Sequence, residues 1–444
     1  MSEGHNSPPA DPGRSIDLRA PLWAAAAAVV VLFLGPAFVG AFRPGPDVYA
    51  DFVQEWLSAR NYWNGEPAYL PQRQAFLRET GIDAPRFDTE LHWNAHPPAA
   101  VAVALPFGLF SDYRTAHLVW NLVTFPLFLA GVVLVLRELA VPWHWWSVFP
   151  ATALVVASQP LGCQLFQGQL NTLLFLLFAV MWVADRRGCA VWAGTALGLA
   201  TALKLYPGFL GVYFLLTGRW RVLVAAAVAF LAANAAALAV LGLDDFRTYV
   251  QKVVPSLMNY QTSWRNVSLT GFWLRLFDPQ AHEKVLPLVS NPVVGKAALL
   301  ASRLLVVAAV GWAAWRARTP ERRDRAFAVA VVGMVLVTPV AWTHYFILLA
   351  IPVGLLWMRL PAGPERWLMW AIFATLWLPE YAFAWLAVGK PQALAMINLE
   401  HDPVGPAVSL TALSAFTYSL LILFALTLRL PTAPAGMPGE TDRA

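Results

Sequence analysis

Long apolar segments separated by short arginine-bearing loops constrain this chain more than any other feature. A membrane-spanning helix needs about 20 apolar residues, and fewer where neighbouring protein shelters it. Twelve segments meet this requirement: 22–42, 115–136, 147–162, 170–185, 190–203, 206–218, 221–242, 293–315, 326–342, 345–358, 366–386 and 407–428. The 444 residues are 58% hydrophobic and 13% charged, against about 45–50% and about 25% in soluble domains. The sequence therefore predicts an all-α polytopic membrane protein with about twelve transmembrane helices.

The basic residues between these segments predict the topology, because short cytoplasmic loops are enriched in Lys and Arg. The loops carry Arg137, then Arg186 and Arg187, then Arg219 and Arg221, then Arg316, Arg318, Arg322, Arg323 and Arg325, and finally Arg359 and Arg366. Twelve spans with both chain ends in the cytoplasm place every cluster on the cytoplasmic side. The net charge of +5 is thus explained by topology, and we expect no nucleic-acid partner.

The segment "HPPAAVAVALPFGLF", which begins at His96, is apolar enough to resemble a short span. Counting it as a span would put Arg137 outside and invert the later clusters. We therefore predict a helix in the outer interface, begun by Pro97 and Pro98. The long loops then all lie on the outer side: 43–114, 244–292 and 387–406.

The ends of the chain differ in composition from the apolar body. Residues 1–21 are polar and Pro-rich, which predicts a disordered cytoplasmic N-terminus, and 431–444 form a similar tail. Residues 22–430 make up one transmembrane domain. The first apolar run is too long for a cleaved signal sequence, so it is interpreted as a retained helix. Cys163 and Cys189 fit no disulfide framework or metal motif.

The stretch "YADFVQEW" follows the first span and carries Asp51 and Glu55 four residues apart, on one face of a predicted helix. Phe52, Trp56 and Trp63 give this helix an apolar side that would suit the membrane surface. A carboxylate held there could take a proton from an incoming hydroxyl while a lipid presents the electrophile. The alternative is that Asp51 caps the helix or is simply solvated. Glu55, and after it Asp47, are reserve candidates for the base.

Lys204, in "LKLYPG", interrupts an apolar stretch that is too long for one span and barely enough for two. Arg187 and Arg219 flank the stretch on the cytoplasmic side, so the chain must go out and return. Lys204 then lies at the outer turn, and Pro207 begins the returning helix. A lysine at this depth is costly and indicates an anionic partner such as a lipid phosphate. The alternative is a lysine that reaches to the interface.

Amides gather in "QLFQGQLN", between two apolar spans, and by the same topology they face outward. The residues are Gln164, Gln167, Gln169 and Asn171. Amides both donate and accept hydrogen bonds, which is what sugar hydroxyls require. A polar loop with a glycine turn is the alternative.

Two further outer segments carry candidate ligand-binding groups. His344, in "TPVAWTHYF", lies at an outer turn and could contact a phosphate or relay a proton, or it could be an interface histidine with an ordinary hydrogen bond. Arg265, Asn266 and Ser268, in "QTSWRNVSLTGFWLRLF", could bind an anionic or polyhydroxylated ligand. Every candidate group thus falls on the outer side of a different span, and we expect the set to converge on one outward-opening cavity.

Several of these motifs together resemble a known family. An acidic residue soon after the first span is typical of the GT-C superfamily of polyprenyl-phosphate-sugar-dependent glycosyltransferases. The finer pattern, from about residue 22 to about 430, resembles glycosyltransferase family 87, through "DFVQEWLSARNYWNGEPAYL", "HPPAAVAVALPFGLF", "QGQLNTLLFLLFA", "LKLYPGFLGVYFLL", "NVSLTGFWLRLF" and "WTHYF". That family includes the polyprenol-phosphate-mannose-dependent α-mannosyltransferases of mycobacterial phosphatidylinositol mannoside synthesis.

The resemblance implies a GT-C fold, a polyprenyl-phosphate-sugar donor of the mannose type, an acceptor at the outer face, and inversion at the anomeric carbon. We expect a glycolipid or lipoglycan acceptor, and a protein acceptor is the alternative. It assigns Asp51 to the catalytic acidic position. Lys204, His344 and Arg265 become candidate donor-phosphate ligands, although this chain has His344-Tyr345 where many members have paired histidines. The candidate substrate-binding residues are Glu55, Gln167, Gln169, Asn171, His96 and Tyr206.

No Asp-x-Asp nucleotide-sugar motif is evident, which agrees with a lipid donor, no metal and no cofactor. We expect a multi-pass protein of the inner (plasma) membrane, surrounded by membrane lipids, with its active site on the extracytoplasmic face. The competing hypotheses are a transporter or lipid flippase, and a non-catalytic scaffold. A transporter should carry charged residues near the midplane, whereas the polar groups here cluster at outer ends. The sequence identifies neither the acceptor nor the sugar.

Overall fold

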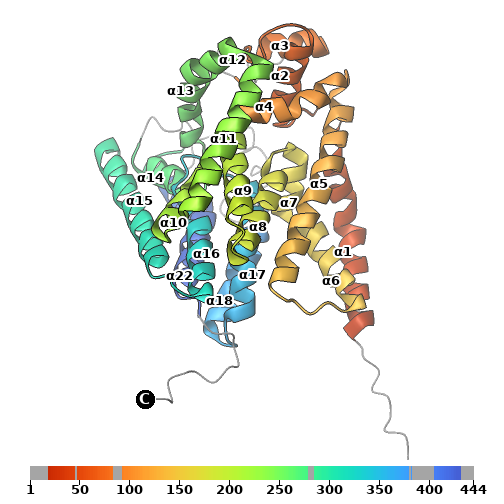
Figure 1. Cartoon of the computed structure of the whole chain (residues 1–444). Coiled ribbons are helices and arrows are strands. Elements are labelled where there is room, and N and C mark those ends of the chain that lie inside the picture. The colour runs from red at the N-terminus through yellow and green to blue at the C-terminus, as the bar shows by residue number, and fades with distance from the viewer. Residues whose placement is uncertain are drawn as a thin grey trace, which may run out of the picture.

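The computed structural model describes residues 19–45, 48–83, 93–278, 285–379, 382 and 405–431. The described part is helical throughout, without a β-strand, and its helices run mostly up and down (Figure 1). Asp47 and most of the two predicted tails lie outside the described residues.

The first half of the chain contains α1 (Arg19–Phe42), α2 (Val53–Trp63), α3 (Gln72–Thr80), α4 (Pro98–Ala104), η2 (Leu105–Leu109), α5 (Tyr113–Glu138), η3 (Trp145–Ser147), α6 (Val148–Ala157), α7 (Gln159–Gln167), α8 (Asn171–Arg186), α9 (Ala190–Leu203), η4 (Tyr206–Phe209) and α10 (Leu210–Leu216). The second half contains α11 (Trp220–Leu241), α12 (Leu243–Thr248), η5 (Tyr249–Val253), α13 (Val254–Ser256), η6 (Leu257–Thr262), α14 (Leu269–Phe277), α15 (Pro292–Trp315), α16 (Pro320–Val337), η7 (Thr343–Leu349), α17 (Ala350–Arg359), α18 (Pro364–Trp377), α21 (Pro406–Leu410), η9 (Ala412–Ser414) and α22 (Ala415–Leu428).

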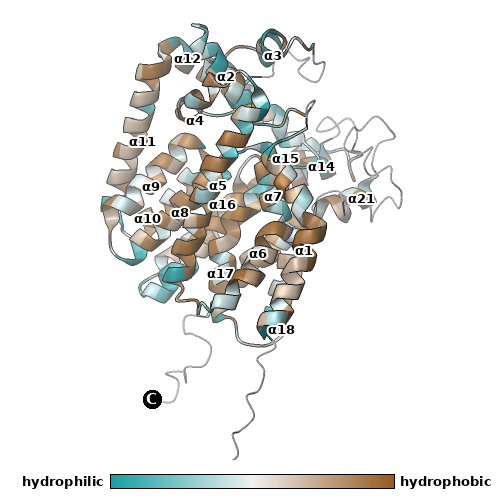
Figure 2. Cartoon of the chain, turned by 90° about the vertical axis from the view of Figure 1, so that its right-hand side faces the viewer, coloured by the Kyte–Doolittle hydropathy of each residue, from teal (hydrophilic) through white to brown (hydrophobic). Residues whose placement is uncertain are grey.

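Five described segments are long and apolar enough to cross a membrane: α1, α5, α11, α15 and Pro406–Leu428. The bent pair α6 and α7 would make a sixth span. Much of the outer surface of these helices is apolar (Figure 2). The all-α, multi-pass membrane character is therefore confirmed. The count of twelve crossings stays a prediction, because several of the twelve segments form shorter helices.

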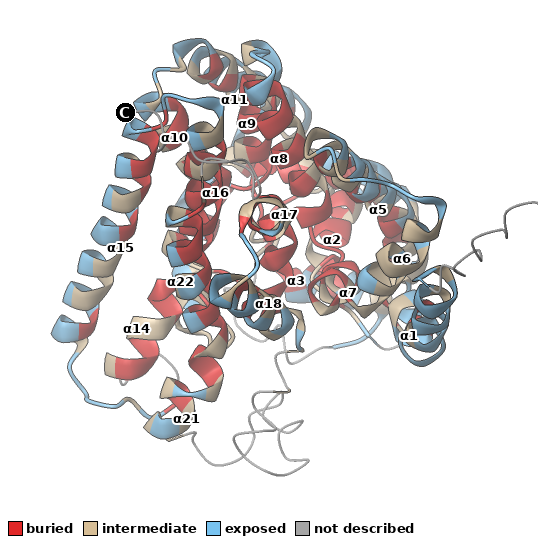
Figure 3. Cartoon of the chain, turned by 90° about the horizontal axis from the view of Figure 1, so that it is seen from below, coloured by how far each residue is buried: buried red, intermediate tan, exposed pale blue. Residues whose placement is uncertain are grey.

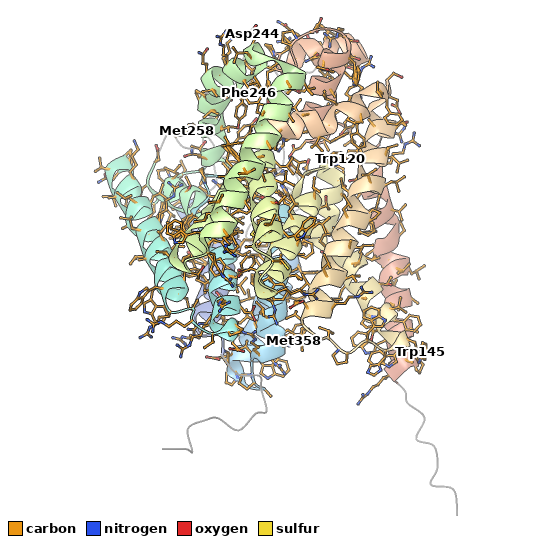
Figure 4. All side chains as sticks on the ribbon, viewed as in Figure 1. Trp120, Trp145, Asp244, Phe246, Met258 and Met358 are labelled. Atoms are coloured by element: carbon orange, nitrogen blue, oxygen red, sulfur yellow. The ribbon has the colours of Figure 1, made fainter. Side chains whose placement is uncertain are left out.

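The arginine loops meet at one end of the molecule. Arg186 and Arg187, at the C-terminal end of α8, both pair with Glu138 at the end of α5. Arg186 also pairs with Asp324 at the start of α16, and Arg359 at the end of α17 reaches the same carboxylate. In Figure 4, Met358 and Trp145 mark this lower end, whereas Asp244 and Phe246 lie at the upper end. The structure thus places the loops that carry these arginines at one end of the molecule, as the predicted topology requires. Which side of the membrane this end faces stays a prediction.

The opposite end is formed by α2, α3, α4 and α12 (Figure 1). The predicted short helix does begin at Pro98, after Pro97. The apolar side of the Asp51 turn and α2, however, is largely packed inside the protein. Phe52 and Trp56 are buried inside the protein, and the Phe52 ring stacks on Trp120 of α5 at 5.1 Å. The expectation that the aromatic residues lie on the membrane surface is therefore wrong for Phe52 and Trp56, which pack in the protein interior, whereas Trp63 is 49% exposed.

Helices α9 and α11 pack with their backbones unusually close. Gly194 and Gly198 lie one turn apart on α9, and a Cβ atom at either would come within 2.3 Å of a carbonyl oxygen of α11. Small residues four apart are the usual means of bringing membrane helices together. The close contact fixes α9, which ends immediately before Lys204.

The span predicted over 147–162 is instead broken into α6 and α7, which meet at 57°. Ser158 caps α7, accepting a hydrogen bond from the Leu161 amide at 3.3 Å. Helix α7 then continues to Gln167, and Gly168 ends it in the left-handed region at φ 63°. Gln164 and Gln167 are therefore helical, which differs from their predicted place between two spans and rules out the alternative of a polar loop for these two residues. Pro160 lies in the first turn of α7, where proline is favoured. The new helix therefore continues past residue 162, the predicted end of the span, to Gln167.

Candidate functional site

The turn that carries Asp51 is held against the end of α7. The Asp51 amide donates to Gln167 Oε1 at 3.1 Å, and the Phe52 amide donates to the Gln167 carbonyl at 2.9 Å. Gly168 makes this approach feasible, because a Cβ there would lie 2.6 Å from Phe52 Cβ. Gln167 therefore positions the Asp51 turn through its backbone and side-chain oxygens.

Gln169 joins a carboxylate to an ammonium group. Its Nε2 donates to Asp51 Oδ2 at 2.9 Å, and its Oε1 accepts from Lys204 Nζ at 2.8 Å. Three segments far apart in the sequence thus meet: the turn before α2, the turn before α8, and the break after α9. A glutamine suits this position because its amide presents a donor and an acceptor together.

Burial shifts the pKa values of Asp51 and Lys204, the two groups that Gln169 joins. It raises the pKa of Asp51, and the Glu55 charge raises it further, although the Gln169 hydrogen bond, His96 and Lys204 oppose the shift. Burial lowers the pKa of Lys204 to about 8, even though Glu55 and Asp51 favour its charged form. The carboxylate is therefore a stronger base than an ordinary aspartate, and the ammonium can lose its proton near neutral pH.

Glu55 and His96 form a second buried pair beside Asp51, with His96 Nδ1 against Glu55 Oε1. Asn94 supports the pair: its Oδ1 accepts from the His96 amide at 3.0 Å, and its Nδ2 donates to Ser58 Oγ at 3.0 Å. Glu55 lies on α2 just past the Asp51 turn, so the helix places both carboxylates at the same site.

A stacked pair of tyrosines lies beside the lysine. Lys204 Nζ lies 5.1 Å from the centroid of the Tyr345 ring. Tyr206 stacks on Tyr345 at 5.0 Å and donates to Asn171 Oδ1 at 2.9 Å. His344 is also buried, and its Nε2 has no hydrogen-bond partner. A buried donor or acceptor without a partner is costly, and a ligand could satisfy it.

The Arg265 segment fits the prediction least well. The Arg265 guanidinium lies over the Trp264 ring at 5.1 Å. Its neighbours have structural roles, which corrects their candidacy as ligand-binding groups. Asn266 donates to the Pro339 carbonyl at 2.9 Å, and Ser268 caps α14 by accepting from the Thr270 amide at 3.2 Å. Buried backbone groups there need these partners.

Three contributors to the site were missed from the sequence. Tyr345 was named only as a neighbour of His344, although its position in "WTHYF" was the available signal. His117 and Asn121 gave no signal, because each is one polar residue within a long apolar helix. They tie the end of α1 to the end of α7: Asn121 donates to the Phe42 and Leu165 carbonyls.

Comparison with known proteins identifies the family. A family model described as glycosyltransferase family 87 matches residues 93–339. This chain belongs to glycosyltransferase family 87. The predicted resemblance is thereby confirmed, although the match covers a shorter region than 22–430 and does not include Asp51, Glu55 or His344.

Curated relatives carry related names. The chain is 27% identical over 334 residues to a Mycolicibacterium smegmatis protein named polyprenol-phosphate-mannose-dependent alpha-(1-2)-phosphatidylinositol pentamannoside mannosyltransferase, covering 68% of this chain and 72% of that protein. It is 28% identical over 327 residues to a Mycobacterium tuberculosis protein of the same name, covering 68% and 69%. A further M. smegmatis protein, named polyprenol-phosphate-mannose-dependent alpha-(1-2)-phosphatidylinositol mannoside mannosyltransferase, is 24% identical over 71% of this chain and 70% of its own length.

This family 87 member is thus a membrane glycosyltransferase, and the comparisons do not favour a transporter or flippase. Among the described residues, no group of three or more His, Cys, Asp or Glu side chains could hold a metal ion. A reaction without a metal stays a prediction.

Proposed function

We propose that this family 87 enzyme transfers a mannosyl group from a polyprenyl-phosphate-mannose donor to a phosphatidylinositol-mannoside-like glycolipid, with inversion at the anomeric carbon. The relatives' names support the choice of donor and acceptor class. The observation that carries the proposal is the hydrogen-bonded chain from Asp51 through Gln169 to Lys204. It brings a base and a cation to one buried site, as a single displacement on a lipid phosphate requires.

Asp51 acts as the general base. It accepts the proton of the acceptor hydroxyl as the hydroxyl oxygen attacks C1 of the donor sugar. The bond between C1 and the phosphate oxygen breaks on the opposite face, and its electrons leave with the phosphate. Inversion by one displacement needs no carboxylate nucleophile. The raised pKa of Asp51 suits this role, because the buried carboxylate gains from accepting a proton.

Lys204 stabilises the leaving group. Charge that grows on the departing phosphate is offset by the ammonium, an effect worth about 3 kcal/mol for a well-placed donor in a dry site. The phosphate in turn restores the protonated form of an amine whose pKa is otherwise about 8. The unpartnered Nε2 of His344 is the second candidate phosphate ligand, and Arg265 completes the predicted set.

The remaining polar groups bind the two sugars. Gln169 and Gln167 hold the Asp51 turn, and Tyr206 donates a hydrogen bond to Asn171 next to the lysine. The charges of the Glu55–His96 pair act on Asp51. We place this site on the extracytoplasmic face of the inner membrane, because the arginine loops lie at the opposite end of the molecule.

Replacing Asp51 by Asn tests the proposal directly. In membranes supplied with radiolabelled polyprenyl-phosphate-mannose and a phosphatidylinositol mannoside acceptor, D51N should lose activity by about 1000-fold while donor affinity changes little. Asp244→Asn is the matched control, since this exposed acid lies on α12 at the same end and should leave turnover unchanged.

Near-normal transfer by D51N would refute the role of Asp51. Movement of the labelled donor across the bilayer without product would instead support the flippase alternative. Anomeric analysis of the product, by NMR, would decide between inversion and retention.

A further inference from the structure

A cavity lined by tryptophans and arginines lies at the other end of the molecule from the Asp51 site, where α15 ends and α16 begins. Its volume is about 480 Å³. The lining residues are Trp312, Trp315, Arg316, Arg318, Arg322 and Arg325. We call it the arginine cavity. None of these residues belongs to the Asp51 site, and the proposed reaction gives them no role.

The positive charge of the arginine cavity is not compensated within the described part of the chain. Elsewhere at this end the arginines are paired: Arg186 and Arg359 with Asp324, and Arg219 with Asp185 at 3.2 Å. No such ion pair joins any of the four cavity arginines to a described acid. Asp324 is adjacent in sequence to Arg325, but its oxygens are already taken by Trp182, Arg186 and Arg359.

One arginine of the cavity also lacks a hydrogen-bond partner. The Nε atom of Arg325 is buried and makes no hydrogen bond. Burial lowers the pKa of this guanidinium, and the charges of Arg322 and Arg316 lower it further. Arginines that repel one another around an open space form a site for an anion with several acceptor oxygens.

The surroundings indicate that this anion belongs to a lipid. Trp315 is 64% exposed, and Trp312, under the Arg316 guanidinium at 5.0 Å, is 45% exposed. Further along the same helix, Leu304 and Leu305 are exposed, and Figure 3 shows α15 along one edge of the molecule with exposed residues on its outer side. Exposed tryptophans beside an apolar helix face are typical of the membrane–water interface.

We propose that the arginine cavity binds the headgroup of an anionic phospholipid, whose acyl chains lie against the exposed face of α15. The headgroup phosphate forms charge-assisted hydrogen bonds with the guanidinium groups and satisfies the Arg325 Nε. Basic pockets between transmembrane helices are known to hold such headgroups. A zwitterionic lipid would leave the net positive charge uncompensated.

The test compares lipids and matched variants of the full-length protein. Purified enzyme in neutral detergent is titrated with dioleoylphosphatidylglycerol, dioleoylphosphatidylcholine or inorganic phosphate, and bound lipid is counted by native mass spectrometry. R318Q/R322Q removes two exposed cavity arginines, whereas R221Q/R429Q removes two exposed arginines outside it. We expect wild type and R221Q/R429Q to retain phosphatidylglycerol, and R318Q/R322Q to bind it about 30-fold more weakly.

The proposal fails if wild type binds both lipids equally, or if R318Q/R322Q loses no more affinity than R221Q/R429Q. It also fails if inorganic phosphate at matched ionic strength competes with phosphatidylglycerol at equal concentration, because the occupant would then be a free anion. Should R318Q/R322Q not fold, the wild-type comparison of the three ligands still decides. Activity is not needed in this experiment, so its outcome is independent of the Asp51 proposal.

Discussion

Gln169 shows how one neutral side chain can hold an acid and a base at a fixed separation. A direct ion pair between Asp51 and Lys204 would neutralise both groups and occupy the lone pairs that accept the acceptor proton. With the amide between them, Asp51 receives a hydrogen bond and Lys204 donates one. Each group keeps free positions for a substrate, and each keeps its own shifted pKa.

These shifts predict a bell-shaped pH dependence of kcat/KM, which reports the free enzyme. Asp51 must be deprotonated, and its raised pKa places the acid limb above the ordinary value of 3.8. Lys204 must be protonated, so activity falls as pH rises through about 8. Initial rates with subsaturating donor, from pH 4 to 10, check both limbs.

Lys204→Arg provides the control for the alkaline limb, because a guanidinium stays charged throughout this range. The alkaline limb should vanish in K204R even if its maximum rate is lower. An unchanged limb in K204R would assign the alkaline titration to another group.

Close helix packing, rather than helix propensity, decides where the site's parts meet. Helices α9 and α11 touch through Gly194 and Gly198, and α9 carries Lys204 at its end. The bend between α6 and α7 plays the same part for Gln167 and Gln169. Both features fix the positions of site residues through the protein backbone. Contact with the surrounding lipid would not fix these positions.

Gly198→Ala tests this packing. A methyl group there would lie 2.3 Å from the Ala226 carbonyl oxygen, so α9 and α11 must separate, at a cost of about 1–3 kcal/mol. We expect a lower thermal unfolding temperature in detergent and reduced transfer, because Lys204 moves with α9. Gly211→Ala, in α10, is the matched control, since the nearest atom to its Cβ would be 3.9 Å away. Equal behaviour of the two variants would contradict the importance of this contact.

The two ends of the molecule have different chemistry. One gathers paired arginines and the arginine cavity; the other gathers short helices around a buried carboxylate, lysine and histidine. The proposed reaction and the proposed lipid site therefore face opposite leaflets.

Cysteine labelling tests that orientation. Cys189 is exposed, beside Arg187 at the arginine end. In intact cells a membrane-impermeant maleimide should leave Cys189 unlabelled and should label it after permeabilisation. Asp244→Cys, in a Cys189→Ser background, should react without permeabilisation, because Asp244 lies at the other end. The reverse pattern would place the Asp51 site in the cytoplasm.

The sequence alone determined the helical, membrane-embedded class and the sorting of these arginine loops to one end, because apolar length and loop charge act locally along the chain. It also identified Asp51, Gln169, Lys204 and His344 as candidate site residues. A polar residue beside an apolar run costs free energy, so it is expected to have a binding or catalytic role. Only the tertiary structure decided that Gln169 joins Asp51 to Lys204, that α2 buries its aromatic side, and that Asn266 supports the backbone. Those outcomes depend on which distant segments pack together, and a one-dimensional pattern of hydropathy and charge does not encode that choice.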